Sequence, residues 1–144
     1  MNAFSSRTSP VATLSGRSSQ RVLVIDDDKY IRSAIAELLT YEGYEVHQAE
    51  DGATGLVIAE RLQPDLILLD LALPERSGLE VLQRVKESQP TRDIPVIIVS
   101  AYATLLLRVE ATRAAGVLHK PFEFQELLNR VNEVARQTTL SPTR

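Results

Sequence analysis

Polar side chains that can do chemistry follow short apolar runs in this 144-residue chain. Asp26 and Asp27 follow the first such run, Asp70 follows a later one, and Ser100 and Lys120 follow two more. A run this short and this apolar is typical of a strand buried on both faces of a parallel sheet. Because the carboxyl ends of parallel strands lie at one edge, where open α/β sheets bind ligands, we expect these side chains to share a pocket. Taken alone, Asp70 would suit a helix cap or a turn equally well, so the prediction depends on the whole set.

The expected pocket would hold three carboxylates, one ammonium group and one hydroxyl. Carboxylates this close repel one another, and a divalent cation relieves that repulsion. Mg²⁺ fits because it takes oxygen ligands and keeps several of its waters. A carboxylate in such a site can act as a nucleophile and form an aspartyl phosphate. Lys120 and Ser100 would then bind the phosphoryl oxygens, so the pattern predicts phosphoryl chemistry at Asp70.

Other catalytic chemistries lack their residues. The sequence has no cysteine, which excludes thiolate nucleophiles, disulfides and cysteine-based metal sites. His47 and His119 lie in expected strands and have no partner motif, so we expect structural or surface roles for them. The aromatic pair Phe122 and Phe124 is expected to pack in the core and not to stack on nucleic-acid bases.

Strand-like and helix-like segments alternate along the chain. Asp28 and Asp51 are expected helix caps, Ser77 is expected to open a helix, and Gly43 is expected to end one. Five nearly all-apolar strands that alternate with five helices predict a single doubly wound (βα)₅ domain of the α/β class around a five-stranded parallel sheet. The expected strands are 21–25, 44–49, 66–69, 95–99 and 117–119, and the expected helices are 30–41, 51–62, 77–89, 103–115 and 123–136.

The two ends of the chain differ in composition from its middle. Residues 1–20 are rich in serine and threonine and contain no acidic residue, so we expect a disordered leader, with an organelle transit peptide as the alternative. Residues 138–144 are expected to form a disordered tail, which leaves 21–137 as the domain. No apolar run approaches the roughly 20 residues that a membrane span needs. The lack of cysteine fits a reducing, cytoplasmic setting.

Charge is also unevenly distributed. The formal net charge is −3, and because Arg7, Arg17 and Arg144 lie in the ends, the middle of the chain is more acidic than that figure suggests. A net negative charge on the middle of the chain argues against direct, nonspecific binding to nucleic acid. We therefore expect neither nucleic acid nor a membrane as a partner.

Four motifs, taken in order, resemble those of the receiver domain of two-component response regulators. They are Asp26-Asp27 after the first strand, the series Asp70, Pro74 and Gly78 at spacings of four, Ser100-Ala101 after the fourth strand, and Lys120-Pro121-Phe122 after the fifth. The resemblance covers residues 21 to about 137. It implies a flavodoxin-like fold and a stand-alone receiver, or a fragment of a larger regulator.

The resemblance implies a role for each matching residue. Asp70 matches the phosphoacceptor, and Asp26 and Asp27 match the acidic pair at the Mg²⁺ site. The backbone carbonyl of Ala72 matches a further metal ligand. Ser100 matches the switch hydroxyl and Lys120 the lysine of the family, while the Lys120–Pro121 bond matches one that is commonly cis.

Two features depart from the family pattern: Val117, and the run Leu105-Leu106-Leu107 where the start of the fourth helix is usually polar. Val117 replaces the aromatic residue that usually precedes the lysine by three positions, so the aromatic half of the switch is expected to be missing or moved, with Tyr102 as its candidate replacement. The residues two past Asp70 and Ser100, which by family analogy control hydrolysis of the aspartyl phosphate, are Ala72 and Tyr102. This pair implies slow self-hydrolysis. Leu106 aligns with the polar side of the expected fourth helix, so we expect it to be exposed, either as an isolated leucine or as part of a contact patch.

The resemblance implies a regulatory phosphoacceptor and not an enzyme. Its phosphodonor would be a sensor histidine kinase or a histidine phosphotransfer protein, and its output would be a protein partner or a homodimer formed through the fourth helix, fifth strand and fifth helix. One alternative is a degenerate receiver that binds partners without phosphorylation; intact Asp27, Asp70, Ser100 and Lys120 argue against it. Another is a metal-dependent phosphatase, which would need a second carboxylate where this chain has Ala72.

Overall fold

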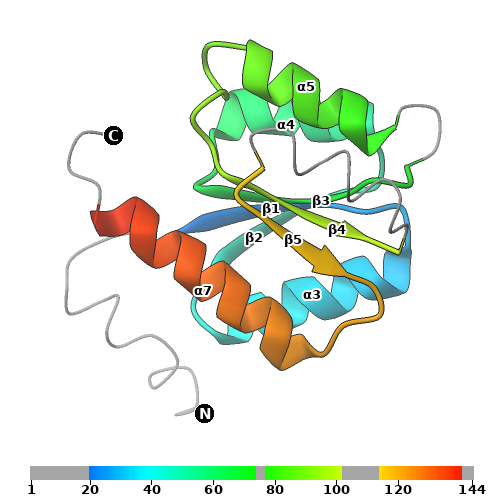
Figure 1. The fold of residues 1–144 in the computed structure, drawn as a ribbon, viewed down its shortest axis with the longest axis vertical. Coiled ribbons are helices and arrows are strands. Elements are labelled where there is room, and N and C mark those ends of the chain that lie inside the picture. Colours follow the sequence, from blue (N-terminus) through cyan, green and yellow to red (C-terminus); the bar gives the residue numbers. More distant parts are fainter. Residues whose placement is uncertain (1–19, 74–76, 102–113, 141–144) are drawn as a thin grey trace, which may run out of the picture.

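The computed structural model describes residues 20–73, 77–101 and 114–140 (Figure 1). Five strands lie within these ranges: β1 (Arg21–Ile25), β2 (Glu45–Ala49), β3 (Leu66–Asp70), β4 (Val96–Ser100) and β5 (Gly116–His119). The helices described are α3 (Lys29–Tyr41), α4 (Gly52–Leu62), α5 (Gly78–Glu87) and α7 (Phe124–Leu140). The helix expected over 103–115 falls mostly on residues outside the described ranges.

The strands form one parallel sheet in the order β2-β1-β3-β4-β5. This order confirms the predicted doubly wound, flavodoxin-like α/β fold, in which the chain crosses over β1 after β2 and continues with β3 on the other side of it. The first strand therefore lies near the centre, beside β3. Their register pairs Ile25 with Leu69, so the residues that follow these two positions emerge side by side at the same edge.

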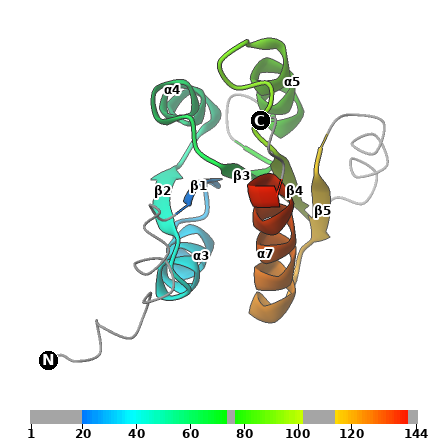
Figure 2. The same ribbon diagram turned by 90° about the vertical axis from the view of Figure 1, so that its left-hand side faces the viewer.

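Helices cover both faces of the sheet, with α4 and α5 on one face and α3 and α7 on the other (Figures 1 and 2). Successive strand residues alternate between the two layers, because neighbouring side chains of a strand point to opposite faces. Leu23, Ile25, Ile67 and Leu69 are buried in one cluster, and the intervening residues are buried in the other. Both faces of the central strands are thus apolar, which explains why their sequences show no alternation with polar residues.

The expected caps are in place. The Asp28 carboxylate accepts from the backbone N–H groups of Tyr30 and Ile31 at the start of α3. Asp51 and Ser77 accept in the same way at the starts of α4 and α5. Most strand and helix bounds agree with the predicted ones within a residue or two.

The last helix is longer than predicted. We expected it to end at Arg136 and the chain to be disordered from Thr138, but α7 runs to Leu140. No glycine or proline lies within this segment, and the first helix-breaking residue is Pro142, which disfavours a helical conformation at the residue before it. The rest of the expected tail, and residues 1–19 of the expected leader, lie outside the described ranges.

Gly78 allows α5 to approach the end of β3. A methyl group built on its Cα would lie 2.4 Å from both the backbone oxygen of Asp70 and the Cα of Leu71. The backbone N–H of Gly78 also donates to the carbonyl of Leu71 at 2.9 Å. Only glycine fits this contact, because the atoms it meets belong to backbone that cannot rotate away.

Replacing Gly78 with alanine should therefore destabilise the fold. We expect the free energy of unfolding in urea to fall by about 1–3 kcal/mol, since the added methyl must displace backbone. Gly116→Ala is the matched control, because its methyl would meet only the Arg130 side chain at 3.5 Å and Ile97 at 3.8 Å. That variant should stay within about 0.5 kcal/mol of wild type. Equal stability of the two variants would contradict the proposed role of Gly78.

Candidate functional site

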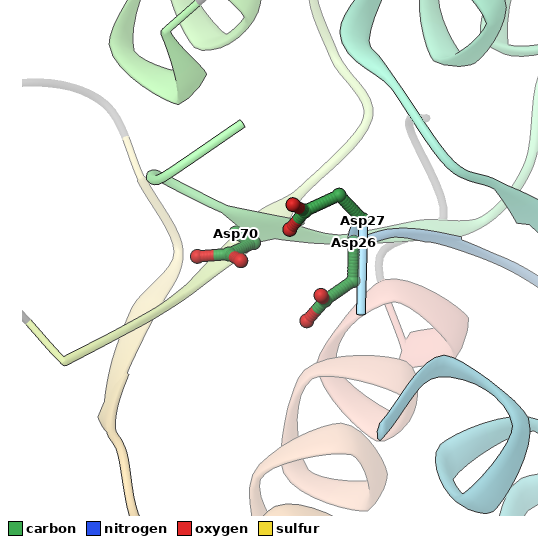
Figure 3. A group of neighbouring side chains, drawn as sticks. All are labelled: Asp26, Asp27 and Asp70. Atoms are coloured by element: carbon green, nitrogen blue, oxygen red, sulfur yellow. The ribbon is translucent and has the colours of Figure 1, made fainter. Parts of the chain in front are cut away.

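Three carboxylates meet where β1 and β3 end (Figure 3). Asp26 follows β1 directly and Asp70 is the last residue of β3; both are buried, whereas Asp27 is exposed. One carboxylate oxygen from each of the three residues lies within 4.8 Å of the others. The predicted acidic cluster is therefore present, with two carboxylates set into the sheet edge and the third facing solvent.

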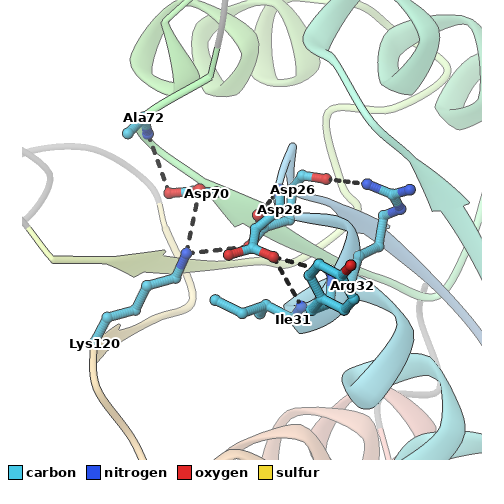
Figure 4. Close-up of polar contacts among 8 residues, drawn as sticks. Asp26, Asp28, Ile31, Arg32, Asp70, Ala72 and Lys120 are labelled. Carbon is cyan, nitrogen blue, oxygen red and sulfur yellow. Dashed lines mark hydrogen bonds and ion pairs between the residues drawn. The ribbon is translucent and has the colours of Figure 1, made fainter.

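Lys120 brings a positive charge to this cluster from the loop after β5 (Figure 4). Its ammonium nitrogen lies 3.2 Å from an oxygen of Asp26 and 3.3 Å from one of Asp70. The Lys120 side chain is 17% exposed and the two carboxylates 3% and 6%, so these ion pairs are largely shielded from solvent. The peptide bond between Lys120 and Pro121 is cis, as the resemblance implied.

Backbone N–H groups hold the other oxygens of the two buried carboxylates. Asp28 donates to Asp26 Oδ1 at 2.8 Å, and Ala72 donates to Asp70 Oδ1 at 3.1 Å. Each buried carboxylate therefore has one oxygen on an amide and the other on Lys120. This arrangement satisfies groups that would be costly to bury alone.

The environment shifts the pKa values of two of these groups. Burial raises the pKa of Asp70, and the neighbouring Asp26 charge adds to the effect, while the Ala72 amide and Lys120 oppose it. Burial by itself would lower the pKa of Lys120, but the charges of Asp70 and Asp26 outweigh it and raise that pKa. Lys120 is thus held in its charged form, whereas keeping Asp70 ionised in the folded state carries a free-energy cost above its ordinary pKa.

The donor set fits a hard divalent cation. Three carboxylates face a single ammonium group among the described residues, which leaves excess negative charge at a partly buried site. The ligands available are all oxygen, and the exposed Asp27 leaves room for retained waters, as Mg²⁺ requires. This Asp triad is typical of the Mg²⁺ site of receiver domains.

Ser100 and Val117 lie on the neighbouring strands β4 and β5, and the switch roles expected for them stay predictions. Ser100 ends β4, is fully buried, and accepts from the backbone N–H of Lys120 at 2.8 Å through its carbonyl. Val117 lies in β5 and packs against the apolar cluster under α4 and α5. Ala72 is exposed beside Asp70. Tyr102 and Leu106 lie outside the described residues, so the expectations for them stay predictions.

An apolar hollow of about 440 Å³ adjoins Lys120. Tyr30 and Phe124 line it and are 83% and 48% exposed. Phe122 packs partly against the core, as expected, but the prediction that Phe124 is also a core residue is wrong. Phe124 is the first residue of α7, and this helix packs on the core through later residues such as Leu127 and Val131.

Sequence reasoning missed one residue that contacts the site. Arg32, in the first turns of α3, donates to the backbone carbonyl of Asp26 at 2.7 Å (Figure 4). A signal was available, because a cation near a helix N-terminus opposes the helix dipole and so suggests a specific acceptor nearby.

Comparison with known proteins identifies the family. Residues 22–132 match the model of the response regulator receiver domain, and the chain therefore belongs to that family. Membership implies a cognate histidine kinase. None of the helices within residues 20–73, 77–101 and 114–140 is long and apolar enough to span a bilayer.

Relatives of known name are regulators. The DNA-binding dual master transcriptional regulator RpaA of Synechocystis is 40% identical over 124 residues, which are 85% of this chain and 52% of that protein. The response regulator MprA of Mycolicibacterium vanbaalenii is 34% identical over 121 residues, 83% of this chain and 52% of that protein. The chain thus spans about half the length of the curated relatives it matches.

Solved receiver structures match along nearly their whole length. The CheY-like receiver domain protein of Methanospirillum hungatei has a TM-score of 0.79 and 30% identity, covering 85% of this chain and 98% of that one. Chemotaxis protein CheY4 of Vibrio cholerae has a TM-score of 0.76 and 28% identity, covering 81% and 99%. The described fold is therefore that of a receiver domain.

Asp27 and Asp28 are neighbours in the chain with different contacts, and substituting each in turn tests the metal site. The Asp27 carboxylate belongs to the acidic cluster, whereas the Asp28 carboxylate caps α3. Asp27→Ala should raise the Mg²⁺ dissociation constant, measured by titration calorimetry, by roughly tenfold or more. Substituting residues that only support metal ligands already weakens metal affinity by that much. It should also reduce the rise in Tm that Mg²⁺ gives the wild type.

Asp28→Ala is the matched control. It removes the cap of α3 but leaves the backbone N–H that binds Asp26. We expect it to lower stability by about 1 kcal/mol and to leave Mg²⁺ affinity unchanged. A wild-type protein that binds no Mg²⁺, or equal losses of affinity in the two variants, would contradict the site.

Proposed function

We propose that the chain accepts a phosphoryl group on Asp70 from a phosphohistidine of a histidine kinase or phosphotransfer protein, with Mg²⁺ required. The observation that carries this proposal is the setting of the Asp70 carboxylate. It lies at the sheet edge between the Ala72 amide and Lys120, with Asp26 and Asp27 beside it. Bound Mg²⁺ would supply positive charge to the transferring oxygens.

The chain's own groups would act as follows. An oxygen of ionised Asp70 attacks phosphorus, a new P–O bond forms, and the P–N bond of the donor histidine breaks, with its electron pair returning to the imidazole nitrogen. Lys120, already charged and 3.3 Å from Asp70, would shift its contact from the carboxylate to the phosphoryl oxygens. No proton needs to leave Asp70, so the site works without a general base.

We propose Ser100 as the group that reports the modification. Ser100 is buried at the end of the strand next to Asp70, and its carbonyl binds the amide of Lys120. A hydroxyl there that turns toward a phosphoryl oxygen would pull on the backbone that continues from β4. The family resemblance implies that a downstream protein or a second copy reads the face made by the expected fourth helix, β5 and α7. Tyr102 and Leu106, in the expected fourth helix, lie outside the described residues.

The donor must bring its phosphohistidine to Asp70. The apolar hollow beside Lys120, with Tyr30 and Phe124 exposed at its wall, supports an approach over the ends of α3 and α7. We place this exchange in the cytoplasm, which the cysteine-free composition fits.

Phosphorylation should require both Asp70 and the metal. After incubation with acetyl phosphate and Mg²⁺, intact-protein mass spectrometry should show one added phosphoryl group on the wild type. Asp70→Asn should fold normally and gain none, because it keeps the size of the side chain but lacks the anionic nucleophile. Excess EDTA should likewise suppress the adduct on the wild type.

Asp28→Asn is the control for an isosteric change close to the site. Asparagine caps a helix as well as aspartate does, so this variant should be modified like the wild type. An undiminished adduct on Asp70→Asn would sink the assignment of the phosphoacceptor. A wild type that stays unmodified with Mg²⁺ would instead support a degenerate receiver. Val117, which stands where the family usually has an aromatic residue, would favour that alternative.

The lifetime of the aspartyl phosphate is a separate prediction, based on the family resemblance. The methyl of Ala72, exposed beside Asp70, cannot orient a water molecule. The double variant Ala72→Asn with Tyr102→Glu should therefore lose its phosphoryl group faster than the wild type, followed by mass spectrometry after removal of the donor. Asp28→Asn should decay at the wild-type rate. A lifetime that is unchanged or longer in the double variant would refute the assignment of these two positions.

A further inference from the structure

Unlike the carboxylates of Asp26 and Asp70, that of Asp27 is not held by another group of the described residues. Among the described residues no hydrogen bond or ion pair reaches its carboxylate, whereas Asp26 and Asp70 each contact an amide and Lys120. Its side chain is exposed at the first turn after β1. The direction of the Asp27 side chain is therefore set by the backbone that carries it.

Two contacts hold that backbone. The Asp28 amide donates to the Asp26 carboxylate and closes the turn on one side. On the other side, Arg32 Nη1 donates to the carbonyl oxygen of Asp26 at 2.7 Å. That carbonyl belongs to the peptide unit that ends at the Cα of Asp27, and the unit is planar. A group that fixes the carbonyl oxygen therefore also fixes the Cα from which the Asp27 carboxylate extends.

Arg32 is itself held in place. It lies on α3, where long side chains point back toward the helix N-terminus, and this directs it to the β1–α3 turn (Figure 4). Its Nε donates to the side-chain oxygen of Gln48 on β2 at 3.1 Å. The planar guanidinium thus links β2 to the turn in a single orientation.

We propose that Arg32 is a positioning residue of the metal site, which fixes the peptide between Asp26 and Asp27 so that the Asp27 carboxylate faces Asp70. This inference depends on the Mg²⁺ site proposed above. It assigns the arginine no contact with the ion or with the phosphoryl group.

The sign of the effect on Mg²⁺ affinity separates positioning from simple electrostatics. Removing a nearby positive charge would by itself tighten the binding of a cation. Loss of positioning would weaken it. Arg32→Met keeps most of the aliphatic stem and removes both donors, and we expect its Mg²⁺ dissociation constant, measured by titration calorimetry, to rise roughly tenfold.

Two further variants serve as rescue and control. Arg32→Lys should recover part of the affinity, because an ammonium group can donate to the same carbonyl. Lys29→Met removes a charge from the same end of α3, at an exposed residue outside the contacts described here, and should leave affinity unchanged or slightly higher. Urea unfolding in EDTA measures the stability of each apo variant, so that a general loss of folding is not mistaken for a loss of positioning.

Gln48→Ala provides a milder variant should Arg32→Met fail to fold. It removes only the second anchor of the guanidinium, and we expect a smaller but measurable rise in the dissociation constant. Unchanged or tighter Mg²⁺ binding in Arg32→Met, or in Gln48→Ala if only that variant folds, overturns the role of Arg32. If Asp27→Ala loses Mg²⁺ binding while Arg32→Met keeps it, the metal site is supported and only the role of Arg32 is overturned. A wild type that binds no Mg²⁺ overturns both proposals.

Discussion

The structure depends on placing like charges together at the edge of a parallel sheet. Asp26 and Asp70 are buried at the ends of adjacent strands, where their repulsion and their loss of hydration both oppose folding. Lys120 offsets this cost by contacting both carboxylates, and two backbone amides bind the remaining oxygens. The balance is incomplete, because Asp27 adds a third carboxylate with no cation of its own among the described residues. That remaining negative charge suits the site to a divalent metal ion.

The fold supplies rigidity where the site needs it. The strands that carry Asp26 and Asp70 are buried on both faces, so their ends cannot move apart without disrupting two apolar clusters. Gly78 brings α5 against the Asp70 peptide, and the N-terminus of α3 is capped by Asp28 directly after the acidic pair. By contrast, Lys120 comes from the loop after the edge strand β5. Under the proposed function, its ammonium group exchanges its carboxylate partners for a phosphoryl group.

Family membership places these features in a signalling context. The chain spans about half the length of the curated relatives it matches, and one of them is a DNA-binding transcriptional regulator, whereas the receiver domain protein of Methanospirillum hungatei is matched along nearly its whole length. The acidic pocket is a property that the chain shares with its family. The Val117 position and the proposed support of Asp27 by Arg32 bear on how the switch and the metal site are built.

The sequence by itself determined the class of fold and most of the site. Short runs that are apolar at every position can be buried only in a sheet covered on both faces, and in a parallel sheet the residues after those runs must share an edge. Asp26, Asp27, Asp70 and Lys120 followed from that constraint, and the caps Asp28 and Asp51 from local hydrogen bonding.

Tertiary structure decided what no local pattern encodes. Arg32 meets Gln48 only because α3 packs beside β2, and Phe124 is exposed because α7 packs on the core through later residues. Contacts of this kind depend on where whole elements lie in space, whereas periodicity and capping depend only on neighbours along the chain.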